Sequence, residues 1–169
     1  LVALVKPVFI INGSGGCGKD TLVNLINEFI PVKNFSSVDK VKQIAKEIGW
    51  DGITKDDKVR KLLSDLKRIT TDFNDMSFID IKREVEDFKK GTEYEAMFIH
   101  IREINEIERA KEEFNATTIL VQRESIEKIT TNQSDANVAN YDYDIIIDNN
   151  GTIDELRNDA KYIANIFIK

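Results

Sequence analysis

A glycine-rich stretch near the start of the chain has the residue types that phosphate binding requires. It consists, in order, of Gly13, Ser14, Gly15, Gly16, Cys17, Gly18, Lys19, Asp20 and Thr21. Glycines let the backbone approach a ligand closely, and successive N–H groups then point into one concavity around phosphate oxygens. The lysine adds a mobile positive charge for the β- and γ-phosphates of a nucleotide. These residues are therefore the expected nucleotide ligands, and Lys19 is also a candidate catalytic residue.

The neighbours of this stretch strengthen the prediction. Residues 8–12 form a short apolar run typical of a buried strand, and residues 19–30 have apolar side chains at helical spacing up to Pro31. A strand, a glycine loop and a helix are the setting in which the G-x-x-x-x-G-K spacing indicates phosphate binding. The helix adds the positive end of its dipole. The alternative is a glycine-rich turn that binds nothing.

The residues after the lysine suggest how a metal ion is held. Asp20 follows Lys19, and the hydroxyl comes one residue later, at Thr21. Most triphosphate hydrolases have Ser or Thr directly after the lysine, bound to magnesium. Because Mg²⁺ prefers oxygen ligands and keeps several waters, we expect Asp20 and Thr21 to organise it. The alternative is that Asp20 only stabilises the helix N-terminus.

Apolar runs and helical periods alternate along the rest of the chain. Strands are predicted at 8–12, 33–36, 96–101, 117–121 and 144–148, with helices between them and after the last. Capping boxes are expected at Thr54 with Asp57 and at Thr152 with Glu155. The helix that begins near Thr54 is expected to bury Val59, Leu62, Leu63, Leu66, Ile69 and Phe73. The alternation predicts an α/β fold with a three-layer, open, doubly wound parallel sheet of about five strands.

Two arginines follow predicted strands. Arg102 comes after the strand at 96–101, and Arg123 comes after the strand at 117–121. Ligands of open α/β sheets bind beyond the carboxyl ends of the strands, so the glycine loop and both arginines should meet at one edge. His100, the only histidine, is expected to be packed or hydrogen-bonded rather than catalytic. Residues 124–142 lack a clear period and are open to two interpretations, a mobile lid or a polar surface loop.

Composition excludes several classes of function. The 169 residues suit one domain, and the net charge of −6, from 30 acids and 24 bases, disfavours a nucleic-acid partner. There is no apolar run of membrane-spanning length and no signal peptide, so no membrane association is expected. A single cysteine fits a reducing, cytoplasmic location. The expected partner is a small molecule, and the chain is expected to be a monomer or a homodimer.

The residues 18–21, read as Gly-Lys-Asp-Thr, resemble the phosphate loop of deoxynucleoside monophosphate kinases of bacteriophages and bacteria. Four later stretches are similar to that family in the same order. They carry Asp39 and Lys42, then Arg60, then Arg102, Asn105 and Glu106, and finally Asn149, Asn150, Gly151 and Thr152. The chain departs from the family in three places. The proline expected after Asp39 and the Gly-Thr expected after residues 60–64 are missing, and His100 stands where the family has an acid.

The resemblance implies a P-loop NTPase fold and the transfer of the γ-phosphoryl group of ATP, with Mg²⁺, to a nucleoside or deoxynucleoside monophosphate. It implies that Arg102 and Arg123 are catalytic and reach the transferring phosphate and the acceptor. The implied acceptor residues are Asp39, Lys42, Arg60 and Arg102, within or near a helical part at about 38–90. Asn149, Asn150 and Gly151 are implied to border the adenine of ATP.

Two other functions stay open. One is a P-loop kinase that acts on another small phosphorylated metabolite, since phosphomevalonate kinases also carry Gly-Lys-Asp, and gluconate and dephospho-coenzyme A kinases share the architecture. The other is an ATP-binding module with little transfer activity, which His100 and the altered acceptor stretches favour.

Overall fold

A computed structural model describes residues 5–125 and 137–168. It contains all five predicted strands. They are β1 (Val8–Asn12), β2 (Val32–Ser36), β3 (Ala96–His100), β4 (Thr117–Gln122) and β5 (Ile145–Asp148). The helices are α1 (Lys19–Asn27), α2 (Asp39–Glu47), α3 (Asp57–Asn74), α4 (Met76–Lys90), α5 (Ile104–Phe114), the short 3-10 helix η1 (Val138–Asn140) and α7 (Ile153–Phe167).

The strands form one parallel sheet in the order β2-β3-β1-β4-β5. Central β1 pairs on both sides, so that Ile10 lies opposite Ile99 of β3 and Thr118 of β4. The chain adds strands first to one side of β1 and then to the other. This is the topology of an open doubly wound sheet, in which ligands bind where the direction changes, at the carboxyl ends of the strands. The predicted fold class is confirmed.

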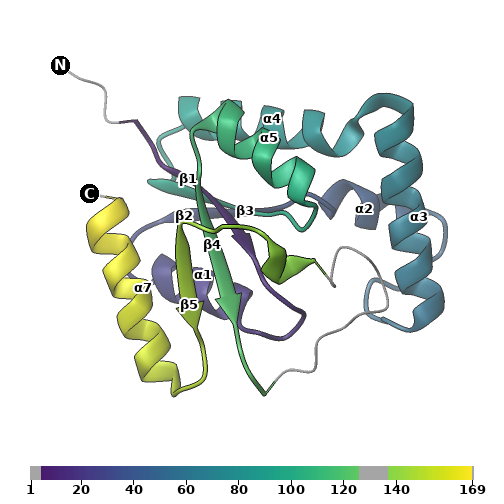
Figure 1. Ribbon diagram of the computed structural model, residues 1–169. Coiled ribbons are helices and arrows are strands. Elements are labelled where there is room, and N and C mark those ends of the chain that lie inside the picture. The colour runs from purple at the N-terminus through teal and green to yellow at the C-terminus, as the bar shows by residue number, and fades with distance from the viewer. Residues whose placement is uncertain (1–4, 126–136, 169) are drawn as a thin grey trace.

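Helices cover both faces of the sheet (Figure 1). One apolar core lies under α4 and α5 and contains Val8 and Ile10, whereas the other lies under α1 and α7 and contains Phe9 and Ile11. Successive residues of a strand point to opposite faces, so a strand covered on both faces is apolar throughout. All five residues of β1 are buried, as this arrangement requires.

The two predicted capping boxes had different outcomes. Thr152 accepts a hydrogen bond from the N–H of Glu155, whose carboxylate accepts from the N–H of Thr152, so this box is confirmed. The box at Thr54 and Asp57 was wrong. Asp56 caps α3 by accepting from the N–H of Val59, because the Thr54 hydroxyl is already bound to Asp51.

Helix α3 does not bury the apolar face that its sequence predicted. None of its residues is fully buried, and Ile69 and Phe73 are 52% and 83% exposed. Val59, Leu62, Leu63 and Leu66 are only half buried. Helix α3 lies at the periphery, and among the described elements its main neighbours are the helices α2 and α4 (Figure 1). An amphipathic helix buries its whole apolar stripe only where another layer covers it.

The helices of residues 5–125 and 137–168 include none that is both long enough and apolar enough to cross a bilayer.

Candidate active site

The glycine loop follows β1 in the middle of the sheet, and close contacts explain two of its glycines. Gly13 has a φ of 150°, and a Cβ there would collide with the carbonyl oxygen of Val121 at the end of β4. Gly18 has a φ of 104°, and a Cβ there would collide with the side chain of Asn149, just after β5. An L side chain fits neither the space nor these φ values. The loop is therefore packed tightly against the ends of both neighbouring strands.

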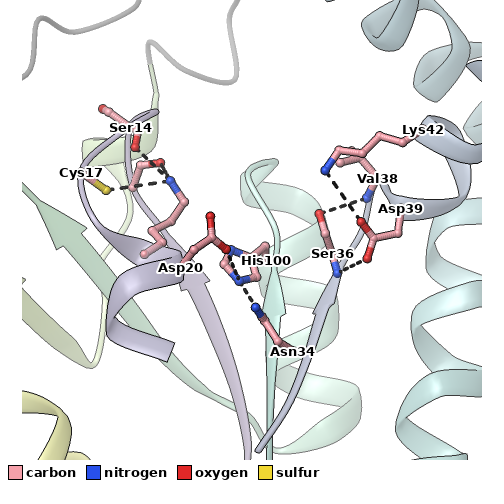
Figure 2. A network of polar contacts seen from close by, with 11 residues as sticks. Ser14, Cys17, Asp20, Asn34, Ser36, Val38, Asp39, Lys42 and His100 are labelled. Atoms are coloured by element: carbon pink, nitrogen blue, oxygen red, sulfur yellow. Dashed lines mark hydrogen bonds and ion pairs between the residues drawn. The ribbon is translucent and has the colours of Figure 1, made fainter. Parts of the chain in front are cut away.

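Lys19, the first residue of α1, folds back over the loop. Its Nζ donates to the carbonyl oxygens of Gly13 and Ser14, at 2.6 and 2.9 Å, and lies 3.8 Å from the Sγ of Cys17 (Figure 2). The Cys17 side chain is fully buried, so it fills the loop from the core side. The contact of the lysine ammonium with a phosphate stays a prediction.

The turn after β5 is hydrogen-bonded to the glycine loop. The Nδ2 of Asn149 donates to the carbonyl oxygen of Cys17 at 2.9 Å, and its N–H donates to Gln122. Asn150 accepts from the N–H of Glu124 at 2.8 Å. Of the three residues expected at the adenine, Asn149 thus lies against the glycine loop, and Asn150 contacts the turn that follows β4. Their contact with adenine stays a prediction, as does that of Gly151.

His100 ends β3 beside the start of α1. Its Nε2 lies 2.7 Å from the Oδ1 of Asn34 and 3.7 Å from the Oδ1 of Asp20 (Figure 2). The side chain is only 15% exposed. Burial lowers the pKa of His100 to about 4. The negative charge of Asp20 raises this pKa, and the positive charge of Lys19 lowers it further. The imidazole is therefore neutral at neutral pH, packed and hydrogen-bonded as expected.

The oxygen donors at the start of α1 fit magnesium. The Asp20 side chain is 81% exposed, and Thr21 beside it is also exposed. Within the described part of the chain, no group of three or more His, Cys, Asp or Glu side chains is arranged to hold a metal ion. An ion here would need nucleotide oxygens as further ligands, which is how Mg²⁺ usually binds in kinase sites. The carboxylate of Asp20, at the start of α1, lies beside His100 at the end of β3.

Two predicted acceptor residues lie together across the sheet edge from the glycine loop (Figure 2). Asp39, the first residue of α2, accepts through Oδ2 from the N–H of Ser36 at 2.9 Å. The Nζ of Lys42 lies 3.8 Å from the Oδ1 of Asp39. Both side chains are close to half exposed. The charges of both residues also act on the pKa of His100, Asp39 raising it and Lys42 lowering it.

Arg60 is separate from this pair. It lies in the first turns of α3, where its Nη1 is 3.9 Å from the Oδ1 of Asp57 in an exposed ion pair. The contacts described do not join it to Asp39 or Lys42. The structure therefore gives no geometric support to Arg60 as an acceptor ligand, and that role stays a prediction.

Both predicted catalytic arginines follow strands at the expected edge. Arg102 lies two residues after the end of β3, and Arg123 directly follows β4; both are exposed. The carbonyl oxygen of Arg102 lies 3.5 Å from the Nδ2 of Asn12, at the end of β1. The backbone at Arg102 is thus held beside the start of the glycine loop. The contact of either guanidinium group with a phosphate stays a prediction.

Sequence reasoning missed two polar pairs near the site, one partly buried and one buried. Lys67 of α3 forms an ion pair of 2.7 Å with Glu106 of α5, and these side chains are only 16% and 14% exposed. Asn12 is hydrogen-bonded to Tyr143, 131 residues away. Lys67 lies two helical turns after Arg60, and Glu106 belongs to the stretch that resembles the kinase family. Neither position indicates that the two side chains form an ion pair. Polar Asn12 at the end of an apolar strand was the only sign of the second pair.

Comparison with known proteins gives matches only at the level of structure. No model of a protein family matches the sequence, and no curated protein matches it. The chain is similar to dephospho-CoA kinase from Campylobacter jejuni, with 16% identity and a TM-score of 0.50 over 95% of this chain and 96% of that one.

Two further solved structures are similar over most of their length. Shikimate kinase from Aquifex aeolicus has 14% identity and a TM-score of 0.47 over 92% of this chain and 94% of that one. A putative kinase from Chloroflexus aurantiacus has 8% identity and a TM-score of 0.48 over 94% and 98%. At such identities a likeness concerns the fold alone. The chain has the α/β fold of P-loop NTPases, with the glycine loop after the central strand.

Proposed function

We propose that this chain is an ATP-dependent phosphotransferase whose acceptor is a small phosphorylated molecule, with nucleoside and deoxynucleoside monophosphates as the first candidates. One observation carries the proposal. Lys19 and the glycine loop lie at the same sheet edge as a second charged cluster, Asp39 and Lys42, with His100 between them. We infer that the donor phosphates bind at the loop and that the acceptor phosphate binds beside Lys42. The family resemblance at Gly-Lys-Asp-Thr supports the choice of acceptor.

In this proposal the glycine loop binds the phosphates of ATP and offsets their negative charge. Phosphoryl transfer needs in-line positioning and charge neutralisation more than covalent chemistry from the protein. The loop N–H groups and the start of the α1 dipole bind phosphate oxygens. Lys19 exchanges its bonds to the carbonyls of Gly13 and Ser14 for bonds to the β- and γ-phosphates. Asp20 and Thr21 hold Mg²⁺, which, when bound, supplies positive charge at the phosphate oxygens.

In this proposal the cluster of Asp39 and Lys42 positions the acceptor. Lys42 offers positive charge to an acceptor phosphate, and Asp39 offers a hydrogen-bond acceptor on the same side. The family resemblance adds Arg60, from the separate helix α3, as a second positive charge for that phosphate. Arg102 and Arg123 neutralise charge on the phosphoryl group as it moves, because the planar guanidinium group binds phosphate oxygens in pairs. His100 is neutral and does not take up protons at neutral pH.

The first test is nucleotide binding at the loop. Titration calorimetry with ATP and magnesium should show binding to the wild type. The Lys19→Ala variant should bind ATP at least tenfold more weakly, about 1.4 kcal/mol, and should remain folded, because the lysine bonds mainly to the carbonyls of the glycine loop. Lys40→Ala, which changes an exposed lysine of α2, is the matched control. Equal ATP affinity in Lys19→Ala and Lys40→Ala would refute binding at this loop.

A panel of acceptors separates the possible functions. Turnover with nucleoside monophosphates supports the leading proposal, and turnover with another phosphorylated metabolite supports a different kinase. ATP binding without turnover supports a nucleotide-binding module.

A further inference from the structure

Asn12 is a buried polar residue that joins three parts of the site. It is the last residue of β1 and is fully buried. Its Oδ1 accepts from the N–H of Gly13 at 2.8 Å, and its Nδ2 donates to the hydroxyl of Tyr143 at 2.9 Å. The same Nδ2 lies 3.5 Å from the carbonyl oxygen of Arg102. The amide orientation is fixed, because only its oxygen can face the N–H of Gly13.

Tyr143 continues this chain of hydrogen bonds away from the loop. It lies between η1 and β5 and is 7% exposed. Its hydroxyl accepts from Asn12 and donates to the carbonyl oxygen of Val138 at 2.8 Å. Burial raises the pKa of Tyr143 to about 12, so the hydroxyl remains a donor at neutral pH. The ring packs edge-on against Tyr141, with centroids 5.0 Å apart.

The hydrogen bonds form a continuous path from η1 to the first residue of the glycine loop. The path runs from Val138 through Tyr143 and Asn12 to Gly13. Gly13 has little freedom to move, since even a Cβ would collide with Val121. A buried donor or acceptor that loses its partner is costly, so such a path favours one arrangement of all its members.

We propose that Asn12 and Tyr143 are positioning residues that couple the segment 138–143 to the glycine loop, so that nucleotide in the loop and order in this segment stabilise each other. The inference rests on the proposed function, because the ligand is the nucleotide. Coupling of two sites is reciprocal, so a nucleotide that fixes Gly13 must also stabilise the segment through Asn12 and Tyr143.

Tyr143→Phe tests the path with the smallest change. It keeps the ring but leaves the Asn12 Nδ2 without the hydroxyl and the Val138 carbonyl without its donor. We expect the dissociation constant for ADP, measured by calorimetry, to rise by more than twofold and at most about tenfold, since the whole value of one buried hydrogen bond corresponds to roughly the larger factor. Tyr141→Phe is the matched control, because it removes a hydroxyl from the neighbouring ring and leaves the bond between Tyr143 and Asn12 in place. Its ADP affinity should stay within about twofold of the wild type.

Hydrogen exchange measures the coupling directly and does not depend on catalysis. ADP should slow exchange of the amides of residues 138–143 in the wild type and in Tyr141→Phe, and should slow it much less in Tyr143→Phe. A role of Tyr143 in folding alone would lower the melting temperature without removing this response.

Each result decides the matter. A wild type that binds no ADP refutes the proposed function and this inference with it. A wild type that binds ADP without slower exchange at 138–143 refutes the coupling alone, even if Tyr143→Phe does not fold. Equal ADP affinity, or an equal exchange response, in a folded Tyr143→Phe also refutes the coupling alone.

Discussion

His100 should make the stability of the protein fall between neutral and mildly acidic pH. The folded state holds the imidazole neutral, with a pKa of about 4, against the ordinary value of 6.5. A depressed histidine pKa means that the unfolded chain binds the proton more readily. Stability from this residue is therefore complete above the unfolded pKa and is lost as the pH falls from about 6.5 toward 4.

The size of the effect follows from the two pKa values. At about pH 5.5 most unfolded chains carry the proton on His100 and few folded ones do, so the free energy of unfolding drops by about 1.4 kcal/mol relative to pH 7.5. Most carboxylates are still ionised at that pH, and His100 is the only histidine. The loss is therefore expected to come mainly from one group.

Urea unfolding of the wild type and of His100→Asn at both pH values measures this effect. The free energy of unfolding of the wild type should fall by about 1.4 kcal/mol more than that of the variant. The NMR titration of the single imidazole gives the folded pKa independently. Equal losses in the two proteins, or an imidazole that titrates near 6.5, would show that burial does not hold His100 neutral.

Three further predictions concern other residues. Asp20→Asn should lower magnesium-dependent transfer about tenfold, roughly 1.4 kcal/mol of barrier, with little change in melting temperature; a variant that keeps wild-type turnover and magnesium dependence would place the metal elsewhere. Lys67→Met should cost about 2 kcal/mol in urea unfolding, because it leaves the partly buried Glu106 without its cation, and adding Glu106→Leu should recover most of this loss; additive costs would contradict the pairing. Phe73→Ser should change stability by less than about 0.5 kcal/mol, whereas Phe78→Ala should cost about 3 kcal/mol; similar costs would mean that α3 buries Phe73.

The sheet was predictable because strands covered on both faces leave a direct trace in the sequence. The central run at Val8–Asn12 was predicted with its true bounds, and each of the other strands differs from its prediction by one residue at one end. Ends were less predictable, since the pattern cannot tell where pairing stops. Helix α1 ends at Asn27 rather than at residue 30.

The errors in α3 have a different cause. The apolar spacing from Val59 to Phe73 correctly predicted a helix, but whether its apolar side is covered depends on the elements beside it. The capping residue of α3 was also missed, because the sequence does not show which of two nearby side chains accepts a hydrogen bond from the first turn of the helix. Asp51 binds the Thr54 hydroxyl, and Asp56 is left to cap the helix.

The site was predictable where its residues are neighbours in sequence. The glycine loop and the start of α1 follow from one stretch, and Asp39 lies near Lys42 because both belong to one helix. Asp20 beside His100, Lys67 beside Glu106 and Asn12 beside Tyr143 depend on the register of separate elements. A local sequence pattern does not show which residues of separate elements lie side by side.

The most direct test of phosphoryl transfer is ADP formation from ATP and magnesium in the presence of each candidate nucleoside monophosphate, with Lys19→Ala measured beside the wild type. Transfer to at least one of these acceptors is predicted, with its diphosphate formed in equal amount to ADP and with the rate in Lys19→Ala reduced at least tenfold, about 1.4 kcal/mol of barrier. ATP binding without diphosphate formation from any nucleoside monophosphate would contradict the proposed acceptor, and wild-type transfer by Lys19→Ala would contradict the proposed site.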